Sequence, residues 1–326
     1  MRWSLDSTIT DQLPLPMRAW VAYVRLGPKR GTGGTVGGNR LFRLAAWLTH
    51  IVASREDRFL TLRHRSAKFS ISVDVGDFEI FNHTIDLWLY GSSESRLLTQ
   101  LMHPGDVFLD IGANYGVYSL LAAYLGGSTS TVYAFEPQDR VAAALAASLP
   151  ANGLTNVSVV NAVVASKVGV TEFFAPTSGS GVGSVFQSHA EQHSAARMIR
   201  VPSTTLDEFA KSQSLTRVDL VKIDVEGAEF EVLSGAQLVL SKFRPFVWFE
   251  VNPSSLAAAG SSQDVLLSTL RACGYTKFYD VAALDNRCQS ASEVRGTYER
   301  LTNIVAVSPD RQSFFDDIFF RSVGSS

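Results

Sequence analysis

Residues 107–137 read VFLDIGANYGVYSLLAAYLGGSTSTVYAFEP, and this stretch decides the fold. A short apolar run ends at Asp110, a Gly-rich turn follows, and a helix-like segment leads to a second apolar run that ends at Glu136. A strand, a glycine turn, a helix and an acid-tipped strand form the first half of a nucleotide-binding βαβ unit. Glycine suits the turn because the backbone has to bend sharply and approach a ligand closely, and a Cβ atom would obstruct both.

The turn has the form Gly-x-Asn-x-Gly, made by Gly112, Asn114 and Gly116, and lacks the Gly-x-Gly-x-x-Gly pattern of dinucleotide sites. Nothing else in the sequence resembles a cradle for pyrophosphate. The pattern therefore favours S-adenosylmethionine, which has no phosphate to hold. Glu136, about twenty residues past the turn, is placed to accept hydrogen bonds from two ribose hydroxyls. The alternative is a turn whose glycines serve packing alone.

Composition and charge exclude several classes of protein. The 326 residues are 46% hydrophobic and 18% charged, as in ordinary globular proteins. With 29 basic and 31 acidic residues, net charge gives no case for binding nucleic acid or a membrane surface. Cys273 and Cys288 have no metal-ligand spacing and cannot form a disulfide framework, so a cytoplasmic location is expected. No apolar run reaches the roughly 18 residues of a membrane span, and no secretory signal is expected.

The chain is expected to divide near residue 100. Residues 1–100 are predicted to be an N-terminal extension that covers the site or mediates assembly into a homo-oligomer, with a flexible Gly-rich segment at 27–39. Alternating strands and helices over residues 101–326 predict an open α/β sheet, mostly parallel and of seven strands, with one antiparallel edge strand. Residues 171–174 and 198–201 are predicted as extra strands joined by an irregular loop.

Residues 218–231, VDLVKIDVEGAEFE, form a second informative stretch. Lys222 and Asp224 share a face of the predicted strand, and a lysine there is costly unless it is paired or opens into a cleft. Asp224 or Glu226 is the expected partner. Both acids follow the strand, at the edge of the sheet where ligands of such folds bind. The alternative is that they satisfy backbone amides and the positive end of the next helix. Glu229 is expected to face solvent or a neighbouring loop.

Glu250, at the end of the fifth strand, is a further candidate carboxylate of the crevice. Together these acids could bind a divalent cation, but no His-containing ligand pattern supports one. The sequence therefore predicts no metal site.

Several motifs together resemble FkbM-type S-adenosylmethionine-dependent methyltransferases over residues 105–281. They are DIGANYGVYS (110–119), AFEP (134–137), VPSTTLDEF (201–209), VDLVKIDVEGAEFEVLSGA (218–236) and RPFVWFEVNP (244–253). The resemblance implies the Rossmann-like sheet of class I methyltransferases and O-methylation of sugars or natural products.

The resemblance also implies which residues bind the cofactor. They are Asp110, Gly112, Asn114 and Gly116 around its methionine part, Glu136 at the ribose, Asn161 and Ala162 near the adenine, Asp224 beside the methyl group or amine, and Glu94 ahead of the first strand.

Methyl transfer to a hydroxyl is an in-line displacement, so donor and acceptor have to be aligned and a base near the hydroxyl helps. Our hypothesis assigns the base to Glu226 or Lys222, with His83 of the extension as a further candidate and Asp224 beside the reacting methyl. Lys222 can act as a base only if burial lowers its pKa. The expected acceptor is a small molecule or saccharide hydroxyl, a polyketide or peptide hydroxyl, or a carboxylate.

Two other functions remain open from the sequence. One is a nicotinamide-dependent oxidoreductase on the same kind of sheet. The other is a non-catalytic module that retains the fold and binds a partner through the N-terminal extension.

Overall fold

A computed structural model describes residues 59–63, 70–74, 92–177, 183–188, 196–284, 294 and 296–320. The predicted Gly-rich segment at 27–39, His83 and Cys288 lie outside the described residues, as does most of the predicted extension. The division of the chain near residue 100 stays a prediction.

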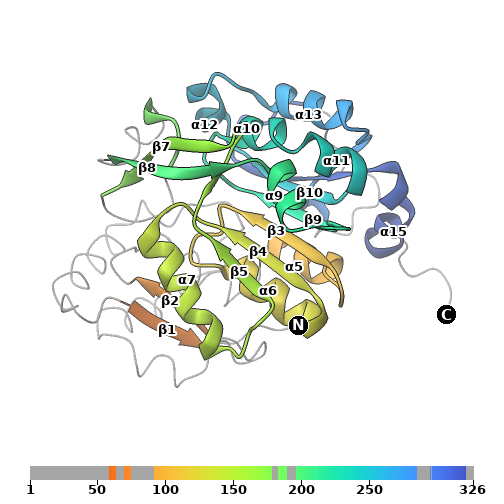
Figure 1. The fold of residues 1–326 in the computed structure, drawn as a ribbon. Coiled ribbons are helices and arrows are strands. Elements are labelled where there is room, and N and C mark those ends of the chain that lie inside the picture. Colours follow the sequence, from red (N-terminus) through yellow and green to blue (C-terminus); the bar gives the residue numbers. More distant parts are fainter. Residues whose placement is uncertain are drawn as a thin grey trace, which may run out of the picture.

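Seven of the described strands form one sheet, in the order β11-β12-β10-β9-β3-β4-β5 (Figure 1). Their bounds are β3 (Val107–Ile111), β4 (Thr131–Phe135), β5 (Val157–Val160), β9 (Leu220–Ile223), β10 (Phe246–Val251), β11 (Lys277–Asp280) and β12 (Thr302–Val307). The first five run parallel, while β12 is antiparallel to both β10 and β11. The predicted α/β sheet is confirmed, and its antiparallel strand, expected at the edge, lies one position in from edge strand β11.

Helices cover both faces of this sheet (Figure 1). On one face lie α5 (Ser93–Leu101), α6 (Val117–Gly126), α7 (Asp139–Ala151), α14 (Val281–Leu284) and α15 (Pro309–Phe319), with the short 3-10 helix η2 (Gly127–Thr129) after α6. On the other lie α9 (Leu206–Ser212), α10 (Glu229–Ser234), α11 (Gln237–Phe243), α12 (Pro253–Ala258) and α13 (Gln263–Ala272). Because both faces are covered, central strands such as β9 and β10 are buried throughout. Within the described residues, no helix has the length and apolar character needed to span a bilayer.

Two smaller sheets accompany the main one. Strands β6 (Val163–Val164), β7 (Gly169–Pro176) and β8 (Ala196–Thr204) form a sheet in which β7 and β8 pair antiparallel. This confirms the extra strands predicted from the sequence. A hairpin of β1 (Phe59–Arg63) and β2 (Ser70–Asp74) contacts the end of α7, where the Asn152 side-chain amide donates to the Ser70 carbonyl.

The turn between β3 and α6 is tight because two of its glycines have no room for a side chain. Gly112 and Gly116 adopt left-handed φ angles of 79° and 83°. A Cβ atom on Gly112 would lie 1.8 Å from the backbone oxygen of Asp224, and one on Gly116 would lie 2.1 Å from Cδ1 of Leu145. The turn is thus packed against the end of β9 on one side and against α7 on the other.

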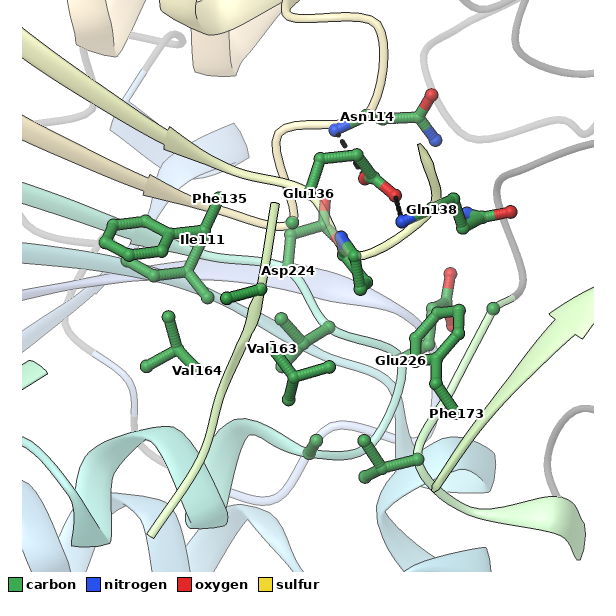
Figure 2. Close-up of a pocket in the computed structure, with 17 residues that line it drawn as sticks. Ile111, Asn114, Phe135, Glu136, Gln138, Val163, Val164, Phe173, Asp224 and Glu226 are labelled. Atoms are coloured by element: carbon green, nitrogen blue, oxygen red, sulfur yellow. Dashed lines mark hydrogen bonds between the residues drawn. The ribbon is translucent and has the colours of Figure 1, made fainter. Parts of the chain in front are cut away.

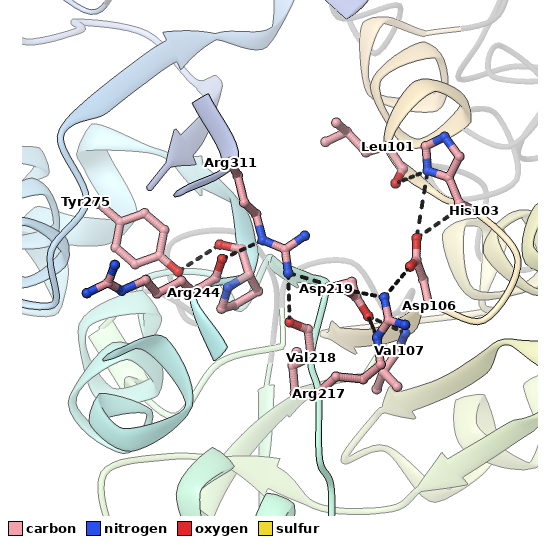
Figure 3. A network of polar contacts seen from close by, with 11 residues as sticks. Leu101, His103, Asp106, Val107, Arg217, Val218, Asp219, Arg244, Tyr275 and Arg311 are labelled. Carbon is pink, nitrogen blue, oxygen red and sulfur yellow. Dashed lines mark hydrogen bonds and ion pairs between the residues drawn. The ribbon is translucent and has the colours of Figure 1, made fainter. Parts of the chain in front are cut away.

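At the opposite end of the strands, a network of ion pairs fixes the starts of β3 and β9 (Figure 3). The Asp219 carboxylate accepts from the Val107 amide at 3.0 Å, from Arg217 at 2.7 Å and from Arg311 at 3.2 Å. Arg217 also donates to Asp106 at 2.9 Å. Burial opposes ionisation of Asp219, but hydrogen bonds from Arg217 and Val107 outweigh it and lower the pKa of Asp219. Asp219 is therefore a charged residue that ties together segments far apart in the sequence.

This network predicts that Asp219→Ala lowers the free energy of unfolding by about 3 kcal/mol, because it leaves two arginines and a backbone amide without their acceptor. Asp310→Ala is the matched control, since Asp310 is 61% exposed and pairs with a half-exposed Arg244. It should cost less than about 1 kcal/mol. Denaturant unfolding of both variants measures the difference. Equal losses would contradict the role given to Asp219.

Candidate functional site

A pocket lies at the carboxyl ends of β3, β4 and β9, on the side of the glycine turn (Figure 2). Its polar lining consists of Asn114, Glu136, Gln138, Asp224 and Glu226. In parallel α/β sheets, ligands bind at this end of the strands. The structure thus brings together acids that stand more than eighty residues apart in the sequence.

Glu136 is the most constrained acid of the pocket. It is buried, its Oε2 accepts from the Asn114 amide at 3.1 Å, and its Oε1 accepts from the Gln138 amide at 2.9 Å. Burial raises the pKa of Glu136 to about 7, although the two backbone hydrogen bonds favour the charged form. The Gln138 side chain also hydrogen-bonds to this carboxylate, which as an acceptor of about four hydrogen bonds can still meet a ligand hydroxyl.

The other wall of the pocket is apolar. It is formed by Ile111, Phe135, Ala162, Val163, Val164 and Phe173 (Figure 2). The sequence singled out Ala162 but missed the wall that β6 and β7 supply. The apolar pair Val163 and Val164, directly after Ala162, is the signal that could have indicated it.

Asn161 is exposed and does not line the pocket. Its side-chain amide donates to the backbone oxygen of Glu136 at 3.0 Å, so it braces the strand end that carries this acid. Gln138 is a lining residue that the sequence did not predict, and its backbone amide holds Glu136 in place. Gly112 and Asn114 line the pocket, while Gly116 packs against Leu145 of α7, and their roles in cofactor binding stay predictions.

Lys222 lies between two carboxylates beneath the pocket. The strand register pairs it with Asp110 of β3, and its Nζ is 3.6 Å from Oδ1 of Asp110 and 3.1 Å from Oδ2 of Asp224. Oδ2 of Asp110 accepts from the Ser119 hydroxyl at 2.6 Å. Asp110 is fully buried and does not line the pocket. It therefore contacts Lys222, and Lys222 in turn contacts the pocket residue Asp224.

The surroundings of Lys222 keep it positively charged. Burial lowers its pKa, but the charges of Asp224 and Asp110 outweigh this effect, and the pKa of Lys222 is raised. The rings of Tyr118 and Trp248 lie 5.3 and 5.7 Å from its Nζ and add favourable cation–π contacts. A lysine that is protonated at neutral pH is a charge partner and not a general base, which favours Glu226 among the two predicted candidates.

Three acids meet where β9 and β10 end. One carboxylate oxygen from each of Asp224, Glu226 and Glu250 lies within 4.8 Å of the others. Glu226 has a left-handed φ of 52°, and its backbone oxygen accepts from the Ser184 hydroxyl at 2.8 Å. Glu250 is buried, and burial together with the charge of Asp224 raises its pKa well above the usual value. Asp224 and Glu226 line the pocket, and Glu250 does not.

Two other predicted acids lie away from the pocket. Glu229 is buried and contacts a neighbouring loop, because its Oε1 accepts from the Val225 and Gly227 amides at 3.3 and 3.2 Å. Burial raises the pKa of Glu229 to about 7. Glu94 lies in the first turn of α5 and accepts from the Asn303 amide at 3.2 Å. The cofactor-binding role of Glu94 stays a prediction.

Comparison with known proteins identifies the family. The model of the methyltransferase FkbM domain matches residues 110–277. The 2-O-methyltransferase NoeI of Sinorhizobium fredii (strain NBRC 101917 / NGR234) is 27% identical over 173 residues, which cover 49% of this chain and 69% of that protein.

Two solved structures are similar in part to the structure of this chain. They are the methyltransferase FkbM from Methylobacillus flagellatus KT, at 12% identity and a TM-score of 0.40, and a precorrin-6y C5,15-methyltransferase from Geobacter metallireducens GS-15, at 15% identity and a TM-score of 0.37. The first overlap covers 72% of this chain and 55% of that one, and the second covers 66% and 87%. The fold is assigned from its own strand order. Because the family model matches just over half of the chain, the protein belongs to the FkbM methyltransferase family.

Proposed function

We propose that the protein is an S-adenosylmethionine-dependent O-methyltransferase that acts on a hydroxyl group of a saccharide or other small molecule. The observation that carries the proposal is the position of the two Glu136 carboxylate oxygens in the pocket. Each accepts a hydrogen bond from a backbone amide, and the pocket has an apolar wall beside them. Membership of a methyltransferase family supports the reaction class. The name of the relative NoeI, a 2-O-methyltransferase, supports oxygen as the acceptor atom.

The residues of the pocket fit this cofactor. Gly112 leaves the backbone of the turn open where a side chain would strike the end of β9. The Glu136 carboxylate suits a ribose diol, and the apolar wall with Phe135 and Val163 suits a flat purine ring. When bound, S-adenosylmethionine supplies an electrophilic methyl group on a positively charged sulfur. The Asp224 carboxylate, at the end of β9, gives this part of the pocket a negative charge that favours such a ligand.

Three residues would share the chemistry. Lys222 holds Asp224 in place by a hydrogen bond of 3.1 Å, so that the Asp224 carboxylate stays at the end of β9. Asp224 puts its charge beside the pocket, where it attracts the positively charged donor. Glu226 also lines the pocket and is our candidate for the base that accepts the hydroxyl proton.

Titration calorimetry of the full-length chain with S-adenosylmethionine tests the cofactor. Glu136→Gln should weaken binding at least about tenfold, because the amide offers one acceptor where the carboxylate offers two charged ones. Wild-type affinity should rise about five- to tenfold from pH 6 to pH 8, because Glu136, whose pKa is about 7, becomes the better acceptor when it loses its proton. Glu136→Gln should lack the part of this rise that Glu136 causes. Any change of affinity with pH that remains in the variant reports titration of the ligand itself and is subtracted from the wild-type change.

NAD is the control ligand in the same titration and should give no saturable heat. Saturable NAD binding, or wild-type affinity for S-adenosylmethionine in Glu136→Gln, would overturn the proposed cofactor site.

The base is tested by label transfer from S-adenosylmethionine to a panel of mono- and oligosaccharides and to a fractionated cell extract. Glu226→Gln should transfer label at least about 100-fold more slowly while it keeps its affinity for the cofactor, because a general base typically contributes this much. The exposed Glu208, on α9, supplies the matched control Glu208→Gln, which should transfer label at the wild-type rate. Unchanged turnover in Glu226→Gln would remove Glu226 from the role of base.

A further inference from the structure

We propose that Asp224, Glu226 and Glu250 form a binding site for one hard divalent cation, such as Mg²⁺ or Mn²⁺, at the ends of β9 and β10. The site adjoins the pocket, because two of its three acids also line that pocket. The absence of a His-containing pattern led the sequence analysis to predict no metal. Carboxylate oxygens alone are nevertheless the ligands that Mg²⁺, Mn²⁺ and Ca²⁺ prefer.

The spacing of the three acids suits such an ion. One oxygen from each lies within 4.8 Å of the other two. Two ligands on opposite sides of a cation lie about twice the metal–oxygen distance apart, which is about 4.2 Å for Mg²⁺ and roughly 4.6–5.2 Å for Ca²⁺. The limit of 4.8 Å falls within the span for Ca²⁺ and slightly above that for Mg²⁺, so the three oxygens can contact one ion after small side-chain rotations.

A second observation points to a ligand at this place. Glu250 is only 9% exposed, and its Oε2 is a buried oxygen that has no hydrogen-bond partner among the described residues. A buried carboxylate oxygen without a partner is costly, and such groups in proteins are normally satisfied by a donor or an ion. The side chain reaches into the cluster, where its oxygen meets those of Asp224 and Glu226.

The charges around Glu250 point the same way. Asp224, Glu226 and Glu229 all disfavour a negative charge on Glu250, and Lys222 favours one. The Lys222 ammonium, however, lies closer to other acids, because it contacts Asp224 at 3.1 Å and Asp110 at 3.6 Å. A divalent cation would offset two of the remaining charges.

The use of this ion rests on the proposed function. A cation beside the pocket would bind the acceptor hydroxyl and lower its pKa, which eases loss of the proton. Each acid needs to give the ion only one oxygen, so ion binding is compatible with Glu226 as the base that accepts that proton.

Binding of Mn²⁺ to the protein tests the site without any cofactor. Electron paramagnetic resonance measures this binding as a loss of the signal of the free ion. We expect about one ion per chain for the wild type and at least about tenfold weaker binding for Glu250→Gln, which loses one of three charged ligands. Glu208→Gln, which removes an exposed carboxylate elsewhere, should bind Mn²⁺ as the wild type does.

Thermal unfolding separates a lost ligand from a damaged fold. Without metal, Glu250→Gln should unfold at a temperature no lower than that of the wild type, because glutamine keeps the size of the buried side chain and cannot carry the charge that burial disfavours. Added Mg²⁺ should raise the unfolding temperature of the wild type, and should raise that of Glu250→Gln by less at the same Mg²⁺ concentration. Failure of the wild type to bind Mn²⁺, or equal binding by Glu250→Gln, would overturn the cation site.

The outcomes for the cation and the cofactor are distinguishable. Mn²⁺ binding that depends on Glu250 in a chain that ignores S-adenosylmethionine would support the cation site and overturn the proposed function. Binding of S-adenosylmethionine by a chain that does not bind Mn²⁺ would support the proposed cofactor and overturn the cation site.

Discussion

A single buried ammonium, that of Lys222, joins the two central strands of the sheet, and the arrangement of the pocket depends on it. The register of β3, β9 and β10 places Lys222 directly beside Asp110 and Trp248. Burying a lysine costs several kcal/mol unless carboxylates accept its hydrogens and charge. Here Asp110 on the neighbouring strand β3 and Asp224 at the end of β9 supply that compensation, so Lys222 links the end of β3 to the end of β9. The glycine turn then fits against β9 because Gly112 has no side chain.

The same low-dielectric surroundings set the ionisation of the other acids. Burial raises the pKa of Glu136 to about 7 and that of Glu250 well above its usual range, while Lys222 is kept charged by its neighbours. The pocket therefore combines an acid poised near neutral pH, a fixed positive charge beneath its floor and an excess of carboxyl groups at one end. Such a distribution favours ligands that carry positive charge and hydroxyl groups.

The features that could be predicted from the sequence are those encoded by neighbouring residues. The strand, turn and strand of residues 107–137 specify one another locally, so the positions of Gly112 and Glu136 followed from the pattern. The pairing of Lys222 with Asp224 followed from the two-residue period of a strand. The location of β12 inside the sheet and the contact of Glu94 with Asn303 depend on long-range packing, which no local pattern encodes. The sequence offers Glu250 as a candidate crevice acid, but the burial of its Oε2 without a hydrogen-bond partner among the described residues is a tertiary property.

We propose that Glu136 holds the ribose of S-adenosylmethionine, with the glycine turn at its methionine part. A crystal structure of the protein with S-adenosylhomocysteine is the sharpest test. Both ribose hydroxyls should lie within about 3 Å of Oε1 and Oε2 of Glu136, with the purine against the wall formed by β6 and β7. A ligand bound elsewhere, or a Glu136 side chain turned away from the ribose, would contradict it.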